Sequence, residues 1–109
     1  MNEEAARERV EQYQQYQQQL QSVMVQKESM QLQLMEIERT LEELNNTKSE
    51  KAYKITGQIM VIKQIEELKT ELAESKEAIE IRSKSLDRTE EKITSRMKEL
   101  ETELKQLVK

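Results

Sequence analysis

Apolar side chains recur at alternating intervals of three and four residues through the first part of the chain. The members of this row are Tyr13, Tyr16, Leu20, Val23, Lys27, Met30, Leu34, Ile37, Leu41 and Leu44. Only Lys27 among them is charged. An unbroken seven-residue repeat is typical of a long helix with one narrow apolar seam, which is the geometry of a coiled coil. The pattern predicts a helix over residues 2–45.

A second row places Leu or Ile at every seventh position in the last part of the chain. Its members are Ile65, Leu72, Ile79, Leu86, Ile93, Leu100 and Leu107. The companion row expected beside it is weak and consists of Leu68, Ser75, Arg82, Thr89, Arg96 and Glu103, with Met97 and Leu104 taking over on the adjacent face. The pattern predicts a second helix over residues 65–109 with one firm apolar row.

The middle of the chain changes period. The polar run from Asn45 to Ser49 competes for backbone hydrogen bonds and should end the first helix. Residues 52–63 (AYKITGQIMVIK) then alternate with a period near two and are rich in β-branched side chains. Gly57, the only glycine, lies at their centre and suits a tight turn. We expect strands over about 52–56 and 59–63, joined at Gly57–Gln58.

The predicted hairpin should not be stable alone, because a single two-stranded hairpin is marginal in water. We expect Ile55, Ile59 and Val61 on one face and Met60 and Ile62 on the other. Both faces are then apolar, and both strand edges offer unpaired backbone groups. The sequence therefore predicts oligomerisation through the hairpin residues Tyr53, Ile55, Gly57, Ile59, Met60, Val61 and Ile62.

A fold-back near residue 58 brings the two heptad rows together. Positions whose numbers sum to about 116 then become neighbours. The apolar pairs expected are Leu44–Leu72, Ile37–Ile79, Met30–Leu86, Val23–Ile93 and Tyr16–Leu100, and Lys27 falls opposite Thr89. The predicted fold is mostly α, a long antiparallel two-helix coiled coil with a central β-hairpin, as a single unit over residues 1–109.

Composition excludes most catalytic chemistry. The chain has no Cys and no His, which removes disulfides, thiolate metal sites and the commonest general base. One glycine cannot form a glycine-rich phosphate loop. Adjacent glutamates such as Glu42–Glu43 do not face each other on a helix and suit a solvated face. We expect no enzyme activity, no catalytic residue, no metal and no cofactor.

Charge and hydropathy argue against nucleic-acid-binding and membrane-spanning proteins. The 109 residues include 37% charged side chains with a net charge of −4, and acids and bases are interspersed. That balance gives no basic patch for nucleic acid. No apolar stretch is long enough to span a membrane, and no signal peptide is evident. We expect a soluble cytoplasmic protein with no nucleic-acid or membrane partner.

Four strings of the sequence resemble the beta-class subunits of prefoldin, the archaeal and eukaryotic co-chaperone, and the archaeal form is the closer match. They are QQYQQQLQSVMVQKESMQLQL (Gln14 to Leu34), LEEL (Leu41 to Leu44), AYKITGQIMVIK (Ala52 to Lys63) and KEAIEIRSKSLDRTEEKITSRMKELETEL (Lys76 to Leu104). The most specific part is the step Tyr53, Lys54 and Gly57. Together the strings cover nearly the whole chain in the order of the family.

This resemblance implies a hexamer of two alpha-class and four beta-class subunits. The hairpins would build a double β-barrel platform, from which the coiled coils extend as tentacles. Nonnative polypeptides would be captured at the tentacle tips, without nucleotide, and passed to a group II chaperonin. The chain would act as an ATP-independent holdase subunit.

Apolar residues near both chain ends are the candidates for contact with nonnative polypeptide, because helix ends fray readily. They are Val10, Tyr13, Tyr16, Leu20, Met97, Leu100, Leu104, Leu107 and Val108. The alternative is that they are ordinary seam residues buried between the helices. Lys27 likewise has two interpretations: a device that specifies register, or a side chain whose ammonium reaches solvent.

Two other functions are open from the sequence. The first is a structural coiled-coil scaffold or adaptor without chaperone activity, which would be a parallel homodimer without strands. The Gly57-centred alternation argues against it. The second is a regulatory module that docks a cytoskeletal or transcription complex, as some eukaryotic prefoldin relatives do.

Overall fold

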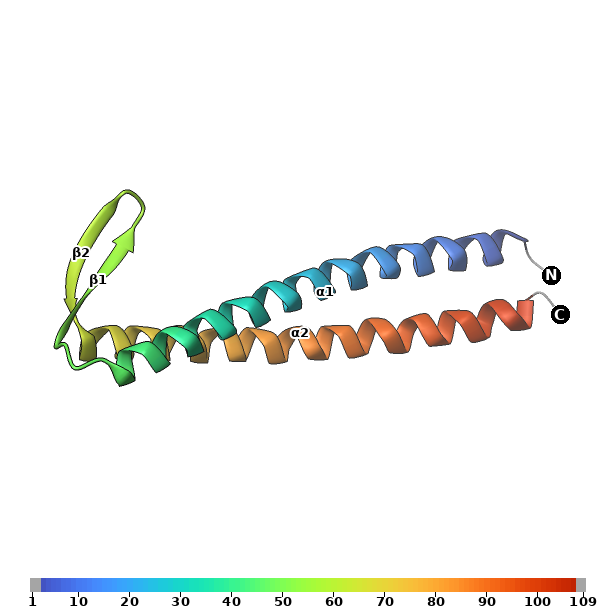
Figure 1. Ribbon diagram of the computed structural model, residues 1–109. Helices are drawn as coiled ribbons and strands as arrows, with labels where there is room; N and C mark the ends of the chain where they lie inside the picture. The colour runs from blue at the N-terminus through green and yellow to red at the C-terminus, as the bar shows by residue number, and fades with distance from the viewer. Residues whose placement is uncertain (1–2, 108–109) are drawn as a thin grey trace. The chain divides into compact units, whose positions relative to one another are not determined.

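Two long helices flank one β-hairpin in the part of the chain that the structure describes, residues 3–107 (Figure 1). This computed structural model contains α1 (Glu3–Asn46), β1 (Lys51–Thr56), β2 (Ile59–Gln64) and α2 (Ile65–Leu107). The predicted fold class, two helices joined by a central hairpin, is confirmed. Each strand extends one residue beyond the expected range at the end away from the turn. The helix ends expected at residues 2 and 109 lie outside the described residues.

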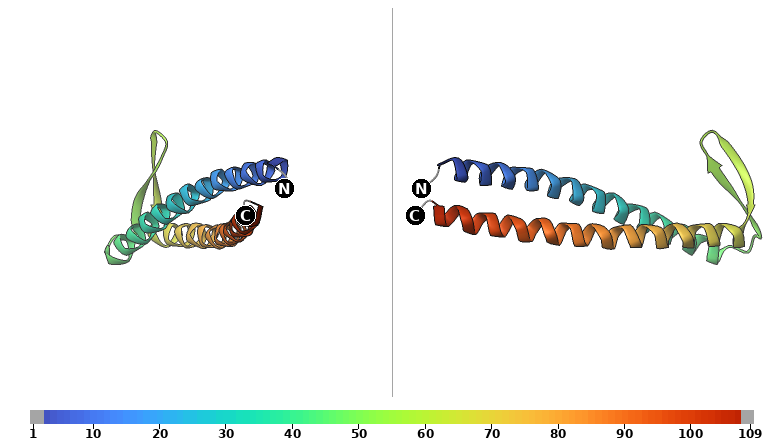
Figure 2. Two further views of the ribbon diagram at one scale, coloured as in Figure 1. Left: turned by 90° about the vertical axis from the view of Figure 1, so that its right-hand side faces the viewer. Right: turned by 180° about the vertical axis from the view of Figure 1, so that it is seen from behind.

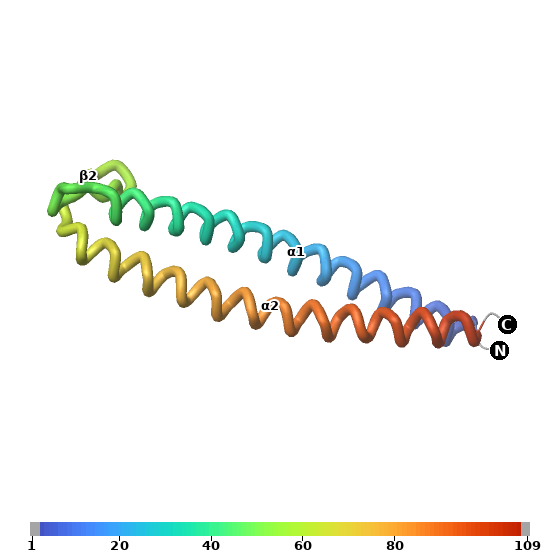
Figure 3. The backbone as a smooth tube through the Cα atoms, turned by 60° about the horizontal axis from the view of Figure 1, so that its bottom comes forward, coloured from blue at the N-terminus to red at the C-terminus, as the bar shows by residue number. Residues whose placement is uncertain are grey.

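The chain divides into two compact units, and each helix contributes to both. The first unit comprises Met1–Ser29 and Ser83–Lys109, of which residues 3–29 and 83–107 are described. The second unit is Met30–Arg82 and contains the hairpin. Within each unit the two helical segments run antiparallel (Figure 3). In the second unit the two strands form a twisted ribbon that leaves the helices where α1 ends and α2 begins (Figure 2).

The side of α1 predicted to be the seam is the side shielded from solvent. From Tyr13 to Asn46, each residue outside the heptad row is exposed, whereas each residue of the row is buried or half-buried. Val23 and Met30 are the most deeply buried, at 6% exposure each. The narrow seam therefore accounts for the burial along this stretch of α1, as a coiled-coil repeat requires.

The firm Leu and Ile row of α2 is also buried or half-buried throughout, and Leu100 is completely buried. The predicted companion row is wrong in its middle, because Ser75, Arg82 and Thr89 are exposed. The half-buried positions lie one residue later, at Lys76, Ser83, Glu90, Met97 and Leu104. Long charged side chains can cover a seam with their aliphatic stems, so polarity was a poor guide to which flank faces α1.

The hairpin turns tightly at Gly57 and Gln58. Thr56 pairs with Ile59, and the antiparallel register continues to Lys51 opposite Gln64. Gly57 has a φ of 62°, and it is the sole residue with positive φ among those the structure describes. Positive φ at the first central position alone is the pattern of a type II′ turn, whose twist suits two flanking strands. Glycine is needed here because an L side chain disfavours this backbone conformation.

The register corrects the expected grouping of hairpin side chains. Ile55 pairs with Met60, and Tyr53 pairs with Ile62, so these four side chains share one face. Ile59 and Val61 lie on the other face, opposite Thr56 and Lys54. The prediction that placed Ile55 with Ile59 and Val61 is therefore wrong. A two-residue turn pairs odd positions with even ones, and a register shift of one residue moves a side chain to the opposite face.

Backbone contacts close the base of the hairpin. The amide of Ile65, the first residue of α2, donates to the carbonyl of Glu50 at 2.9 Å. The Ile65 side chain is 4% exposed, so the step from strand to helix is anchored by burial as well. At the end of α1, the Thr47 amide donates to the Glu43 carbonyl at 3.1 Å. The Ile65–Glu50 bond thus joins the two ends of the hairpin at its base, and the Thr47–Glu43 bond continues the helical hydrogen-bonding pattern one residue beyond α1.

Replacing Gly57 should weaken the hairpin through the backbone alone. A Cβ at this position meets no atom within 4 Å, so Gly57→Ala introduces strain without a clash. We expect a cost of about 1–3 kcal/mol, seen as faster amide hydrogen exchange across β1 and β2. Gln58→Ala, at the neighbouring turn position with negative φ, is the matched control and should leave exchange unchanged. Equal protection in both variants would contradict the turn assignment.

Candidate functional site

The hairpin carries a cluster of exposed apolar side chains, which we call the hairpin surface. Its members are Tyr53, Ile55, Ile59, Met60, Val61 and Ile62, with exposures between 40% and 72%. Both strands are edge strands of a two-stranded sheet, so each has one row of unpaired backbone groups. Contiguous apolar surface of this kind marks an interaction site in a stable protein. The sequence prediction named all six of these residues.

One carboxylate of α2 holds the face of the hairpin that carries Ile59 and Val61. Glu71 contacts Lys63 Nζ at 2.6 Å through Oε1, and Lys54 Nζ at 3.1 Å through Oε2. Hydrogen bonds from Lys63 and then Lys54 lower the pKa of Glu71, and the Glu71 bond raises the pKa of Lys63. The other face, with Ile55 and Met60, has no such tie among the described residues. This is the face most available to a partner.

Sequence reasoning did not find Glu71. The available signal was the alternation of the hairpin, which places Lys54 and Lys63 on one face once the register is known. Lys54 and Glu71 also line a groove of about 380 Å³ together with Leu44, Leu68 and Leu72. The Lys54–Glu71 ion pair therefore borders apolar side chains within the second unit.

The apolar residues predicted near the chain ends are in different environments in the first unit. Val10 is 41% exposed, whereas Leu100 is completely buried. The remaining described members are half-buried, namely Tyr13, Tyr16, Leu20, Met97, Leu104 and Leu107. Val108 lies outside the described residues. In this conformation Leu100 is a seam residue, and it could reach a polypeptide only if the helices parted.

Polar contacts at the margin hold this part of the helix pair together. The hydroxyl of Tyr13 donates to Glu101 Oε1 at 2.8 Å, which raises the pKa of Tyr13. The guanidinium of Arg9 donates to Glu103 Oε2 at 2.8 Å. These groups are solvent-accessible, and exposed ion pairs contribute at most about 1 kcal/mol. These polar contacts therefore add little to the cost of parting the helices, which comes mainly from the apolar seam that includes Leu100.

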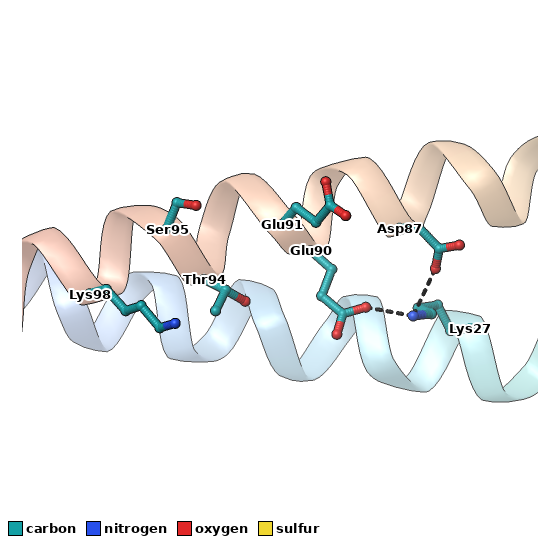
Figure 4. Close-up of a pocket in the computed structure, with 7 residues that line it drawn as sticks. All are labelled: Lys27, Asp87, Glu90, Glu91, Thr94, Ser95 and Lys98. Carbon is teal, nitrogen blue, oxygen red and sulfur yellow. Dashed lines mark hydrogen bonds and ion pairs between the residues drawn. The ribbon is translucent and has the colours of Figure 1, made fainter.

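Lys27, the one charged residue of the α1 seam, is paired across it. Its Nζ lies 2.8 Å from Asp87 Oδ1 and 2.5 Å from Glu90 Oε2. Figure 4 shows the Lys27 side chain with both carboxylates of α2. Hydrogen bonds from Lys27 to these two carboxylates, Asp87 first, raise its pKa to about 12. The expected neighbour Thr89 is exposed instead. The ammonium is therefore held by α2 rather than left to solvent, which favours the interpretation of Lys27 as a register device.

Within residues 3–107, neither helix contains a stretch apolar and long enough to cross a membrane. No group of three or more acidic side chains there is arranged to hold a metal ion.

Two helices joined by a hairpin define the class of two-helix coiled-coil proteins, and the exposed apolar side chains of the hairpin are a candidate interaction surface. A family model described as prefoldin subunit matches residues 7–109. The chain therefore belongs to the prefoldin subunit family, a family of chaperone subunits.

Individual relatives show that the similarity extends to prefoldin beta subunits in particular. The chain is 42% identical over 100 residues to the prefoldin subunit beta of Archaeoglobus fulgidus, covering 91% of this chain and 86% of that one. It is 41% identical over 86 residues to that of Pyrococcus furiosus, covering 78% and 74%. The crystal structure of the prefoldin beta subunit from Thermococcus strain KS-1 matches with a TM-score of 0.87 and 31% identity, over 95% and 92% of the two chains. The predicted resemblance to archaeal beta-class subunits is confirmed.

The Glu71 contacts predict an ordered response to lysine substitution. Because Lys63 lies closer to Glu71 than Lys54 does, Lys63→Met should raise the Glu71 pKa more than Lys54→Met. Carbon-detected NMR titration of the carboxyl measures this. The lowered pKa means that the ion pair stabilises the fold fully at neutral pH and is lost as pH falls through that value. Lys69→Met, which removes a contact to Glu66 instead, should leave Glu71 unchanged, and an equal shift in all three variants would contradict the assignment.

Charge reversal tests the contact across the seam. Lys27→Glu places a third carboxylate beside Asp87 and Glu90, so the thermal midpoint should fall. Adding Glu90→Lys restores an opposite pair and should recover most of the loss. Lys92→Glu makes the same charge change at an exposed position of α2 and should have little effect. Additive effects of the two seam substitutions in a double-mutant cycle would mean that Lys27 and Glu90 do not interact.

Proposed function

We propose that this chain is a subunit of an ATP-independent chaperone that assembles through its hairpin and holds nonnative polypeptides on its helices. The observation that carries the proposal is the hairpin surface, whose six large apolar side chains are exposed in the single chain. Covering that surface requires another chain. Membership of the prefoldin subunit family supports the same function.

Assembly would use strand edges as well as side chains. Each strand has a free edge to which a hairpin of a neighbouring subunit can add. The face with Tyr53, Ile55, Met60 and Ile62 would be buried first, because Glu71 already holds the other face. We propose a hexamer of two alpha-class and four beta-class subunits around a double β-barrel.

Capture would take place on the first unit, where apolar side chains are exposed or shielded by weak contacts. Val10 is accessible as it stands, and Tyr13 needs only to release Glu101. Tyrosine and methionine suit varied partners, because one is amphipathic and the other adaptable. Leu104, Leu107 and Val108 complete the proposed contact set, with Tyr16, Leu20, Met97 and, after parting of the helices, Leu100. We propose further that the assembly acts in the cytoplasm, performs no catalysis and passes its clients to a group II chaperonin.

Two variants should separate assembly from capture. The cross-strand pair Ile55→Ser with Met60→Ser should abolish the complex with an alpha-class subunit, as measured by native mass spectrometry. Removal of residues 1–12 and 104–109 should leave the complex intact, with the mass expected for the shortened chain. The shortened assembly should be several-fold less effective in suppressing light scattering by a guanidinium-unfolded enzyme diluted into buffer.

The matched control for the hairpin pair is Lys51→Ser with Gln64→Ser. These residues form a cross-strand pair on the same face but lie at the polar base of the hairpin, so assembly should persist. Full suppression of aggregation by the shortened assembly would mean that capture takes place away from the chain ends. Assembly of wild-type protein without any suppression would favour the structural scaffold or adaptor instead.

A further inference from the structure

The first unit contains an open groove whose lining is dominated by glutamine. The groove has a volume of about 650 Å³. Its lining residues are Gln14, Gln17, Gln18, Leu20, Gln21 and Met24 from α1 and Met97 from α2. No lining residue carries a charge, although 37% of the chain is charged. The groove lies within a neutral stretch of α1, because residues 12–26 carry no charged side chain.

The glutamines follow the axis of α1. Gln14, Gln17 and Gln21 are separated by three and then four residues, so they form one stripe with a step of about 5.4 Å per turn. All three are exposed, and none of the groove glutamines makes a side-chain hydrogen bond within the described residues. Each amide offers two donor hydrogens and an acceptor oxygen. The stripe is therefore a row of free amides facing solvent.

The other three lining residues of the groove are apolar. Leu20 and Met97 are half-buried and come from different helices, and Met24 is 50% exposed at one end. Thioether side chains adapt to partners of different shape. The groove thus combines free amides with adaptable apolar side chains.

We infer that this groove binds an extended, uncharged segment of polypeptide through its main chain. The glutamine amides hydrogen-bond to the segment's N–H and C=O groups, and Leu20, Met24 and Met97 receive an apolar side chain. The inference rests on the proposed function and deepens it, because it assigns to one site the contacts that are independent of client sequence.

The chemistry of the groove favours this occupant over others. An extended strand presents main-chain groups to one side about every 6.7 Å, a spacing that long glutamine side chains can reach from a 5.4 Å step. A helical partner has already satisfied its own backbone groups. A nucleic acid needs cations, and the lining supplies none. A charged peptide would lose hydration without gaining an opposite charge.

A matched pair of triple variants tests the inference in the assembled protein. Gln14, Gln17 and Gln21 are each changed to Glu in the first, and Gln12, Gln15 and Gln19 in the second. The two sets have the same spacing, exposure and charge change, but the second lies outside the groove lining. The probe is a fluorescein-labelled peptide of about eight residues alternating Leu and Ser, followed by anisotropy. We expect at least about tenfold weaker binding for the first triple and less than about twofold change for the second.

A backbone-modified probe tests the role of the main chain. The same peptide methylated on alternate main-chain nitrogens keeps its side chains but loses donors on one edge. It should bind the wild-type assembly several-fold more weakly than the unmodified peptide does. The first triple variant should weaken the binding of the methylated peptide little further. Versions of both triples with Ala in place of Glu remove the amides without adding charge, and Ala preserves the helix. These versions give the same comparison if the added carboxylates disturb folding.

The outcomes separate this inference from the proposed function. Equal losses in both triples, or unchanged binding of the methylated peptide, would overturn the main-chain role of the groove. If the wild-type assembly suppresses aggregation but does not bind the peptide, the groove inference is wrong and the chaperone function survives. Failure of both peptide binding and suppression would overturn both.

Discussion

The structure depends on a narrow apolar seam between two helices. From Tyr13 to Asn46, the shielded residues of α1 are those of the heptad row, and the Leu and Ile row of α2 is shielded throughout. The buried apolar side chains of the described residues all belong to the helices, and no strand residue is among them. The hairpin must therefore rely on other contacts, and its own apolar residues remain exposed. Exposure of the hairpin surface in the single chain follows directly from this distribution of side chains.

Charged groups at the edges of the apolar contacts supply the specificity that a uniform seam lacks. Lys27 pairs with Asp87 and Glu90 in the first unit, and Glu71 pairs with Lys54 and Lys63 in the second. Each set of ion pairs joins different elements, so each would favour one register or orientation over others. All are solvent-accessible and therefore weak and sensitive to salt. The arrangement suits a protein whose helices must pair correctly and still yield to a partner.

Membership of the prefoldin subunit family gives these surfaces a common purpose. A chaperone that binds without catalysis needs a means of assembly and a surface that accepts unrelated sequences. We propose that the hairpin surface meets the first need, through its edges and apolar faces. For the second need we propose two kinds of contact on the first unit, namely apolar side chains near the chain ends and the neutral glutamine groove. Side chains differ among clients but the main chain does not, so the groove would add contacts that every client can make.

The sequence by itself determined the elements. Heptad spacing placed both helices, and the period-two segment around Gly57 placed the hairpin, because these patterns express local backbone geometry. Tertiary structure decided which neighbours meet. It put Lys76 and Glu90 rather than Ser75 and Thr89 beside the seam, grouped Ile55 with Met60, and joined Glu71 to two hairpin lysines. Periodicity assigns a residue to a stripe of its own element, but which flank of that stripe faces a partner depends on register, and a shift of one residue changes the answer.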